Sequence, residues 1–152
     1  MPLESEFLFS VSVELDPDSQ LVGPTPQGDR TIVYVTGGTF EGPKLRGEVL
    51  PGGGDWIRRR ADGVMQLDVR VTLRTDDGAL IYVQYSGIND ASPEVREKRA
   101  RGEEVAASEL YFRTTPYFET GAEKYAWLNK IVAVGVGRFE PNGVGYDIYA
   151  IK

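Results

Sequence analysis

Hydrophobic and polar residues alternate along several short segments of this chain, which is the pattern of half-buried β-strands. In residues 6–15, one face carries Phe7, Phe9, Val11, Val13 and Leu15. The same period recurs in residues 64–74. Further strands are predicted at residues 31–36, 45–50, 56–60, 80–85, 109–115, 131–139 and 144–151.

Short turn signals separate these strands. Asp62-Gly63, Asp77-Gly78 and Asn142-Gly143 lie between pairs of them, and such dipeptides tolerate the positive φ angles that two-residue hairpins require. We therefore expect a hairpin at each pair. An irregular loop is expected at residues 16–30, a turn at Gly37-Gly38, and another turn at residues 116–120.

Two segments are predicted to be helical. Ser92 supplies an N-cap, Pro93 suits the first turn, Glu94 and Lys98 pair at four-residue spacing, and Gly102 ends the segment. This helix has almost no hydrophobic face, so we place it on the surface. A second short helical turn is expected at residues 122–128.

About eight to ten strands in series, without alternating helices, predict an all-β protein. A barrel or a sandwich would satisfy the pattern. We favour a single antiparallel β-barrel over residues 1–152, with one or two short surface helices, because closure removes exposed strand edges.

The composition removes several classes of chemistry. The chain has no histidine and no cysteine, so it lacks disulfides, zinc–thiolate sites, thiol nucleophiles and the commonest general base at neutral pH. Asp16-Pro17-Asp18 lacks the glycine and the distal glutamate of a calcium loop. We expect neither a metal nor a cofactor, and any catalysis would depend on carboxylates, tyrosines, arginines and hydroxyls.

The net charge of −6 and the pI of about 4.8 argue against nucleic acid or an anionic membrane as a partner, because both require a basic surface. No segment approaches the roughly 20 apolar residues of a membrane helix. The first residues have neither the basic flank nor the apolar run of a signal peptide. We expect a cytoplasmic protein whose partner is a small organic molecule.

The polar face of residues 64–74 has two interpretations. Asp68 and Arg70 lie on it, opposite the hydrophobic side chains. In the first interpretation this face is exposed to solvent, as one face of an antiparallel sheet often is. In the second it faces the inside of a barrel, where Asp68 and Arg70 form a charge pair in a cavity. Arg70 would there keep Asp68 ionised or bind a substrate carboxylate.

Three consecutive glycines precede Asp55 and Trp56. No Gly-Lys-Ser/Thr follows them, which excludes a phosphate loop. The glycines either connect two strands or form a rim loop that places Asp55 and Trp56 at the mouth of a pocket. A carboxylate and an aromatic face at that position would suit a cyclic ligand.

Aromatic and polar residues gather between residues 111 and 129. This region contains Tyr111, Arg113, Glu119, Tyr125, Trp127 and Asn129. Aromatic residues in such density usually form core. However, Arg113, Glu119 and Asn129 would need polar partners if they were buried. They belong either to a structural network or to a functional site.

Several of these segments resemble the bacterial and fungal family called domain of unknown function 3237, also known as uncharacterised protein family 0311. They include Thr36-Gly37-Gly38-Thr39-Phe40-Glu41-Gly42-Pro43, Gly52-Gly53-Gly54-Asp55-Trp56, Leu67-Asp68-Val69-Arg70 and Tyr125-Ala126-Trp127-Leu128-Asn129. The resemblance runs in collinear order along nearly the whole chain. It implies an antiparallel β-barrel that is often a homo-oligomer, and it implies little about activity.

Three functions remain open. The first is a cofactor-independent enzyme of isomerase, lyase or cyclase type, acting on a small cyclic or aromatic molecule in the barrel cavity. Its candidate residues are Asp68 or Asp55 as the base, Tyr111 or Tyr125 as proton donors, Arg70 and Arg113 as anion-binding groups, and Trp56, Glu119, Trp127 and Asn129 as further ligand contacts. The second is a ligand-binding barrel without chemistry, and the third is a structural subunit of a homo-oligomer.

Overall fold

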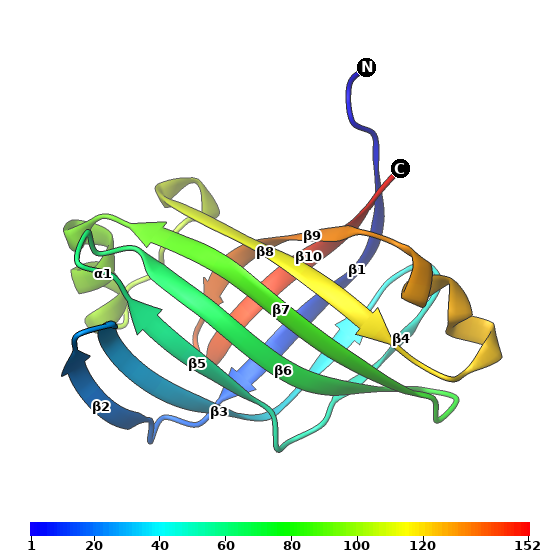
Figure 1. Ribbon diagram of the computed structural model, residues 1–152, viewed down its shortest axis with the longest axis horizontal. Helices are drawn as coiled ribbons and strands as arrows, with labels where there is room; N and C mark the ends of the chain where they lie inside the picture. The colour runs from blue at the N-terminus through cyan, green and yellow to red at the C-terminus, as the bar shows by residue number, and fades with distance from the viewer.

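Ten strands form one antiparallel sheet in the computed structural model, which describes residues 1–152 (Figure 1). They are β1 (Ser5–Leu15), β2 (Gln20–Thr25), β3 (Gly28–Glu41), β4 (Arg46–Val49), β5 (Gly54–Arg59), β6 (Met65–Thr75), β7 (Leu80–Ala91), β8 (Leu110–Glu119), β9 (Ala133–Glu140) and β10 (Gly143–Ile151). The sheet closes because β1 pairs with both β10 and β3. β4 and β5 both bridge β3 and β6, which gives an eight-stranded closed barrel and confirms the predicted fold class.

Three short helical segments lie outside the barrel wall: α1 (Pro93–Ala100), and the 3₁₀ turns η1 (Ala107–Glu109) and η2 (Glu123–Lys130). The Ser92 side chain caps α1 by accepting a hydrogen bond from the Val95 amide at 3.2 Å, as the sequence predicts. α1 and η2 lie at opposite ends of the barrel (Figure 1). No helix is both long enough and hydrophobic enough to cross a membrane.

The inward faces of the strands form one hydrophobic core of 27 buried residues. In β6 the alternation holds without interruption, and Leu67, Val69 and Val71 are all buried. In β1 a bulge between Phe7 and Phe9 changes the alternation. As a result Leu8 is buried beside Phe9, whereas Phe7, predicted on the inner face, is exposed.

Two predicted breaks in the strands are wrong. Residues 16–30 are not an irregular loop, because β2 and the start of β3 form a hairpin there. Gly37-Gly38 does not turn the chain, since β3 continues through it to Glu41. Gly38 has a φ of +141°, and a Cβ on it would lie 2.0 Å from the Ser12 carbonyl oxygen. This glycine allows β3 to lie close against β1, rather than reversing the chain.

Other boundaries also differ from the prediction. β8 continues through Pro116 to Glu119, where a turn was expected. β7 continues beyond Tyr85 to Ala91. The hairpins at Gly63 and Gly78 are confirmed by their positive φ angles. The third hairpin turns one residue earlier than predicted, at residues 141–142, since Gly143 already pairs with Glu140.

Glycines in β9 give the aromatic side chains of β8 room inside the barrel. A Cβ on Gly137 would lie 2.5 Å from the Phe112 ring, and Phe112 is only 1% exposed. The ring in turn packs edge-to-face on Tyr146, with centroids 5.3 Å apart. A side chain at position 137 therefore displaces the centre of the core.

We predict that Gly137→Ala lowers the free energy of unfolding by about 1–3 kcal/mol, because the added methyl group overpacks a filled core. Urea denaturation of the purified variant measures this. Gly121→Ala is the matched control, since no atom lies within 4 Å of its Cβ position. Equal stability of the two variants would contradict the prediction.

Candidate functional site

The barrel interior contains a cavity of about 260 Å³ at the end covered by α1. Hydrophobic inward-facing side chains make up most of its wall. The polar or charged members of the wall are Asp55, Arg59, Tyr85, Asn89, Arg96, Arg99 and Tyr146. Beyond the cavity, towards η2, hydrophobic side chains of the core fill the interior.

The strand register arranges these groups in two rows. Asp55 on β5 and Tyr85 on β7 both pair with Val69 on the intervening strand β6. Arg59 and Asn89 likewise both pair with one β6 residue nearer to α1. Four residues separate the rows along β5, which corresponds to about 13 Å at ~3.3 Å per residue. The cavity therefore has a deep end at Asp55 and an outer end at Arg59.

Asp55 is the acidic group of the deep row. It is 8% exposed and forms no salt bridge. Burial raises the pKa of Asp55 to about 7, against a smaller opposing effect of the hydrogen bond that its Oδ1 accepts from the Asp68 amide at 3.0 Å. A carboxyl group with this pKa is present in both protonation states at neutral pH, so it can act as a general acid or a general base.

Two tyrosines lie beside this acid. Tyr85 and Tyr146 are 7% and 2% exposed, and their rings pack edge-to-face with centroids 5.3 Å apart. Burial raises the pKa of both hydroxyls. The neighbouring hydroxyl lowers the pKa of Tyr85 and raises that of Tyr146, and the charge of Asp55 raises both. Both tyrosines therefore stay protonated and can donate hydrogen bonds to a ligand.

Asn89 belongs to the outer row and is 4% exposed. Its Oδ1 is the one buried side-chain polar atom without a hydrogen-bond partner. Buried polar atoms are almost always paired, so an unpaired one in a cavity wall needs an explanation. A ligand that donates a hydrogen bond to this oxygen would supply the missing partner.

Arg99 holds α1 across the end of the barrel, whereas Arg96 bonds to the segment just before the helix. Arg96 donates to the Ala91 carbonyl at 2.7 Å, and Arg99 donates to the carbonyls of Glu140 and Gly143, each at 3.0 Å. The Arg99 guanidinium also lies 4.3 Å from the centre of the Phe139 ring. α1 is thereby attached to the β9–β10 turn on the far side of the cavity.

Asp68 and Arg70 do not face the cavity. They form the predicted charge pair, with 3.6 Å between nitrogen and oxygen, but their side chains are 48% and 44% exposed on the outside of β6. The interpretation that places them inside the barrel is wrong, because the hydrophobic side chains of β6 occupy the interior. The rim-loop interpretation is also wrong: Asp55 and Trp56 lie within β5, with Asp55 inside the barrel and Trp56 outside.

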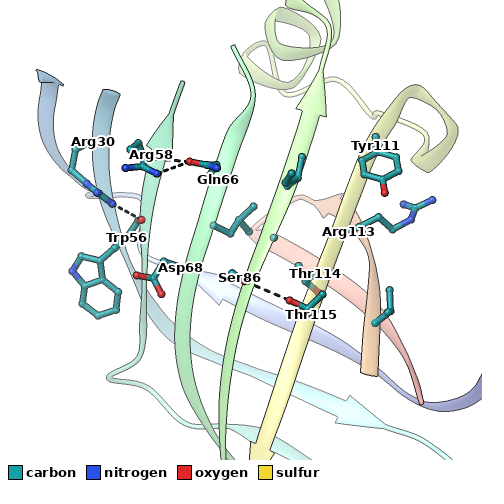
Figure 2. Close-up of a pocket in the computed structure, with 14 residues that line it drawn as sticks. Arg30, Trp56, Arg58, Gln66, Asp68, Ser86, Tyr111, Arg113, Thr114 and Thr115 are labelled. Atoms are coloured by element: carbon teal, nitrogen blue, oxygen red, sulfur yellow. Dashed lines mark hydrogen bonds between the residues drawn. The ribbon is translucent and has the colours of Figure 1, made fainter. Parts of the chain in front are cut away.

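A wide groove of about 860 Å³ crosses the outer face of β5 to β8 (Figure 2). Trp56 and Tyr111 stand on opposite sides of it, and Asp68 and Arg113 also line it. Arg113 donates to the Phe112 carbonyl at 3.0 Å and lies over the Tyr111 ring at 4.9 Å. Arg70 lies over the Trp56 ring at 5.5 Å.

Four other predicted site residues are distant from both places. Buried Tyr125, in η2, donates its hydroxyl proton to Asp77 at 2.9 Å. Asn129 accepts a hydrogen bond from the Thr120 amide at 2.9 Å, and Lys44 lies over the Trp127 ring at 5.1 Å. Glu119 is exposed at the end of β8. The structure thus splits the predicted site into three: Asp55 in the cavity, one set in the outer groove, and one set around η2.

Sequence reasoning missed most of the cavity wall. Tyr85, Asn89, Tyr146, Arg59 and Arg96 were not among the candidates, although four of them lie at inward positions of strands. Extending the alternation of β7 beyond Tyr85 would have placed Asn89 inside, where a polar residue is unusual. The structure contains no cluster of three or more acidic residues that could hold a metal ion.

We predict that wild-type protein loses stability relative to Asp55→Asn as the pH rises from 5 to 8. The pKa of Asp55 is raised from an ordinary value of 3.8 to about 7. The stability that the protonated Asp55 carboxyl group contributes to the free energy of unfolding is fully present below the unfolded-state pKa. It is lost as the pH rises through the folded-state pKa. The whole loss, between the unfolded pKa of 3.8 and the folded pKa of about 7, is about 4 kcal/mol at 1.36 kcal/mol per pKa unit, and roughly 3 kcal/mol of it falls between pH 5 and pH 8. Urea denaturation of both proteins at the two pH values tests this, and a pH-independent difference between them would contradict it.

Comparison with known proteins identifies relatives along the whole chain. The family described as "Protein of unknown function (DUF3237)" matches residues 3–151. A UPF0311 protein of Rhodopseudomonas palustris is 34% identical over 149 residues, which is 98% of this chain and 97% of that protein. A hydroalkoxylation enzyme of Penicillium herquei, phnH, is 31% identical over 134 residues, or 88% of this chain and 74% of the enzyme.

Solved structures agree with the fold. A conserved protein of unknown function from Rhodopseudomonas palustris superimposes with a TM-score of 0.93 at 32% identity, covering 100% of this chain and 99% of the other. A β-barrel-like protein from Acinetobacter baumannii gives a TM-score of 0.86 at 41% identity, covering 100% and 98%. These matches confirm the resemblance predicted from sequence, and the chain belongs to the DUF3237 family, which includes the UPF0311 proteins.

Proposed function

We propose that this protein is an enzyme that encloses a small cyclic molecule beneath α1 and uses Asp55 as a general acid and base. The observation that carries the proposal is a buried carboxyl group, with a pKa of about 7, in a cavity whose wall is mostly hydrophobic. Titratable groups shifted by burial in this way concentrate at functional sites.

The chemistry that suits this site is a redox-neutral addition of a hydroxyl group across a carbon–carbon double bond. Protonated Asp55 would give its proton to one alkene carbon while the hydroxyl oxygen bonds to the other. The hydroxyl proton then returns to Asp55, so one O–H bond and the π bond of the alkene are exchanged for one C–H and one C–O bond. The hydroalkoxylation activity of the Penicillium herquei relative supports this reaction class. Because no electrons are gained or lost, the reaction requires no redox cofactor.

The remaining polar groups of the cavity would orient the substrate. Tyr85 and Tyr146 can donate hydrogen bonds to an oxygen on which negative charge develops near Asp55. Asn89, in the outer row, can accept a hydrogen bond from a second polar group of the same molecule. The hydrophobic wall excludes water, which would otherwise compete for the alkene.

A second candidate is a barrel that binds the same kind of molecule without changing it. The mostly hydrophobic cavity of about 260 Å³ favours either role equally. The two candidates differ only in whether Asp55 transfers a proton, so a substitution that preserves its shape distinguishes them.

We predict that the protein cyclises phenols that carry an ortho-alkenyl chain, such as 2-allylphenol and 2-prenylphenol, and that Asp55→Asn reduces the rate by at least about 100-fold. General acid–base catalysis typically contributes 10²–10⁴-fold, and the amide removes the transferable proton while keeping the acceptor for the Asp68 amide. Product formation measured by chromatography, with melting temperature as a check on folding, tests this.

Asp68→Asn is the matched control, because it changes a carboxylate on the outer face of the same wall. It should retain most of the activity. If Asp68→Asn lost turnover while Asp55→Asn retained it, the catalytic site would lie in the outer groove and not in the cavity. Binding of the phenols without any product would instead support the non-catalytic barrel.

A further inference from the structure

Three arginine side chains, from β5 and α1, line the cavity. They are Arg59, Arg96 and Arg99. None of them forms a salt bridge. Their hydrogen bonds go only to backbone carbonyls, those of Gly63, Ala91, Glu140 and Gly143.

Other arginines of this acidic chain pair with carboxylates, as in Arg46–Asp76, Arg60–Asp62 and Arg101–Glu103. Of the remaining arginines, only the three in the cavity and the three in the outer groove form no salt bridge. Burial lowers the pKa of Arg59 and the neighbouring charge of Arg96 lowers it further, while the charge of Asp29, which pairs with Arg59 across strands, raises it. Partly buried like charges are costly to keep together. Their repulsion would be relieved by an anion between them.

Two of the three arginines have most of their donors free. A guanidinium group carries five N–H donors. Arg59 and Arg96 each use one of these on a backbone carbonyl. Arg99 uses both terminal nitrogens to hold α1 against the β9–β10 turn. Arg59 and Arg96 are therefore the pair available to a ligand.

We propose that Arg59 and Arg96 bind the carboxylate of an organic acid whose hydrophobic ring occupies the cavity. The inference rests on the proposed function in taking the cavity as the substrate site, and it adds the class of molecule. A planar carboxylate can accept paired hydrogen bonds from guanidinium groups. The acid group would lie in the outer row, about 13 Å along β5 from Asp55, so the opposite end of the molecule points toward the reacting acid.

The size of the cavity limits this ligand. A volume of about 260 Å³ corresponds to the space of roughly nine water molecules, at about 30 Å³ each. A substituted single ring fits this limit better than a fused polycycle. The unpaired oxygen of Asn89, in the same row as Arg59, adds an acceptor for a hydrogen bond from such a molecule.

The outer groove is the competing anion site, since it contains Arg30, Arg58 and Arg113. Arg58, however, forms two hydrogen bonds to the Gln66 Oε1 atom, at 3.2 and 2.8 Å, and Arg30 donates to the Trp56 carbonyl at 2.7 Å. The carboxylate of Asp68 also lies in this groove and would repel an anion. The cavity is therefore the better site, and variants of Arg113 separate the two.

The test is calorimetric titration of the full chain with 4-hydroxybenzoate and with its neutral counterpart 4-hydroxybenzamide. We predict that the wild type binds the acid at least about tenfold more tightly than the amide. Arg59→Gln and Arg96→Gln should each weaken binding of the acid by about tenfold or more and leave binding of the amide unchanged. Arg59→Lys keeps the positive charge but loses the planar guanidinium group that can form two parallel hydrogen bonds to a carboxylate. The affinity of this variant for the acid should therefore be intermediate.

Two matched controls complete the design. Arg101→Gln changes an exposed arginine at the end of α1, and Arg113→Gln changes the outer groove; both should bind the acid as the wild type does. Weaker binding in Arg113→Gln alone, equal affinity for acid and amide, or no binding of the acid would each overturn the proposal. Melting temperatures of the free variants show whether each is folded.

The two proposals fail in different ways. A protein that binds 4-hydroxybenzoate through Arg59 and Arg96 but cyclises no alkenyl phenol contradicts the enzymatic function alone. A protein that cyclises 2-allylphenol through Asp55 and does not distinguish acid from amide contradicts the carboxylate site alone.

Discussion

The pairing of β1 with both β10 and β3 is the constraint on which the rest of the structure depends, because it closes the sheet. In a closed sheet every strand has one face inside and one outside, and a shift of one residue would exchange the two. Asp55 is held inside by its pairing with Val33 and Val69 on the two neighbouring strands. The position of the acid thus follows from the register of the barrel rather than from any local motif.

The alternation of hydrophobic and polar residues predicted much of this fold. Strands such as β1 and β6 have large side chains at alternate positions, so burial of one face determines them. β2 contains glycine and proline and has exposed leucine and valine side chains, so nothing in its pattern distinguishes it from a loop. Gly38 is indistinguishable from a turn residue in the sequence, because its close approach to Ser12 depends on a strand distant along the chain.

The candidate site was only partly predictable for a related reason. Charged residues are the usual candidates for a functional site in a sequence. Asp68 and Arg70, however, lie on the solvent-facing side of β6, where charged residues are common. Tyr85 and Tyr146 have the ordinary appearance of core residues, and only the cavity beside them gives their hydroxyls a chemical role. Tyr125 and Asn129 are close to Arg113 in sequence, yet β8 carries the chain along the barrel before η2 begins. Closeness in sequence therefore did not indicate closeness in space.

The hydrogen bond between the Asp68 amide and Asp55 Oδ1 connects the outer face of the wall to the acid inside. Residue 68 acts on that acid in two opposite directions. Its backbone N–H stabilises the ionised form of Asp55, whereas the negative charge of its side chain disfavours that form. The side-chain charge is half-exposed and is therefore screened by dissolved salt, while the backbone hydrogen bond is not. The acidity of a group enclosed in the barrel consequently depends on the ionic strength of the solution outside it.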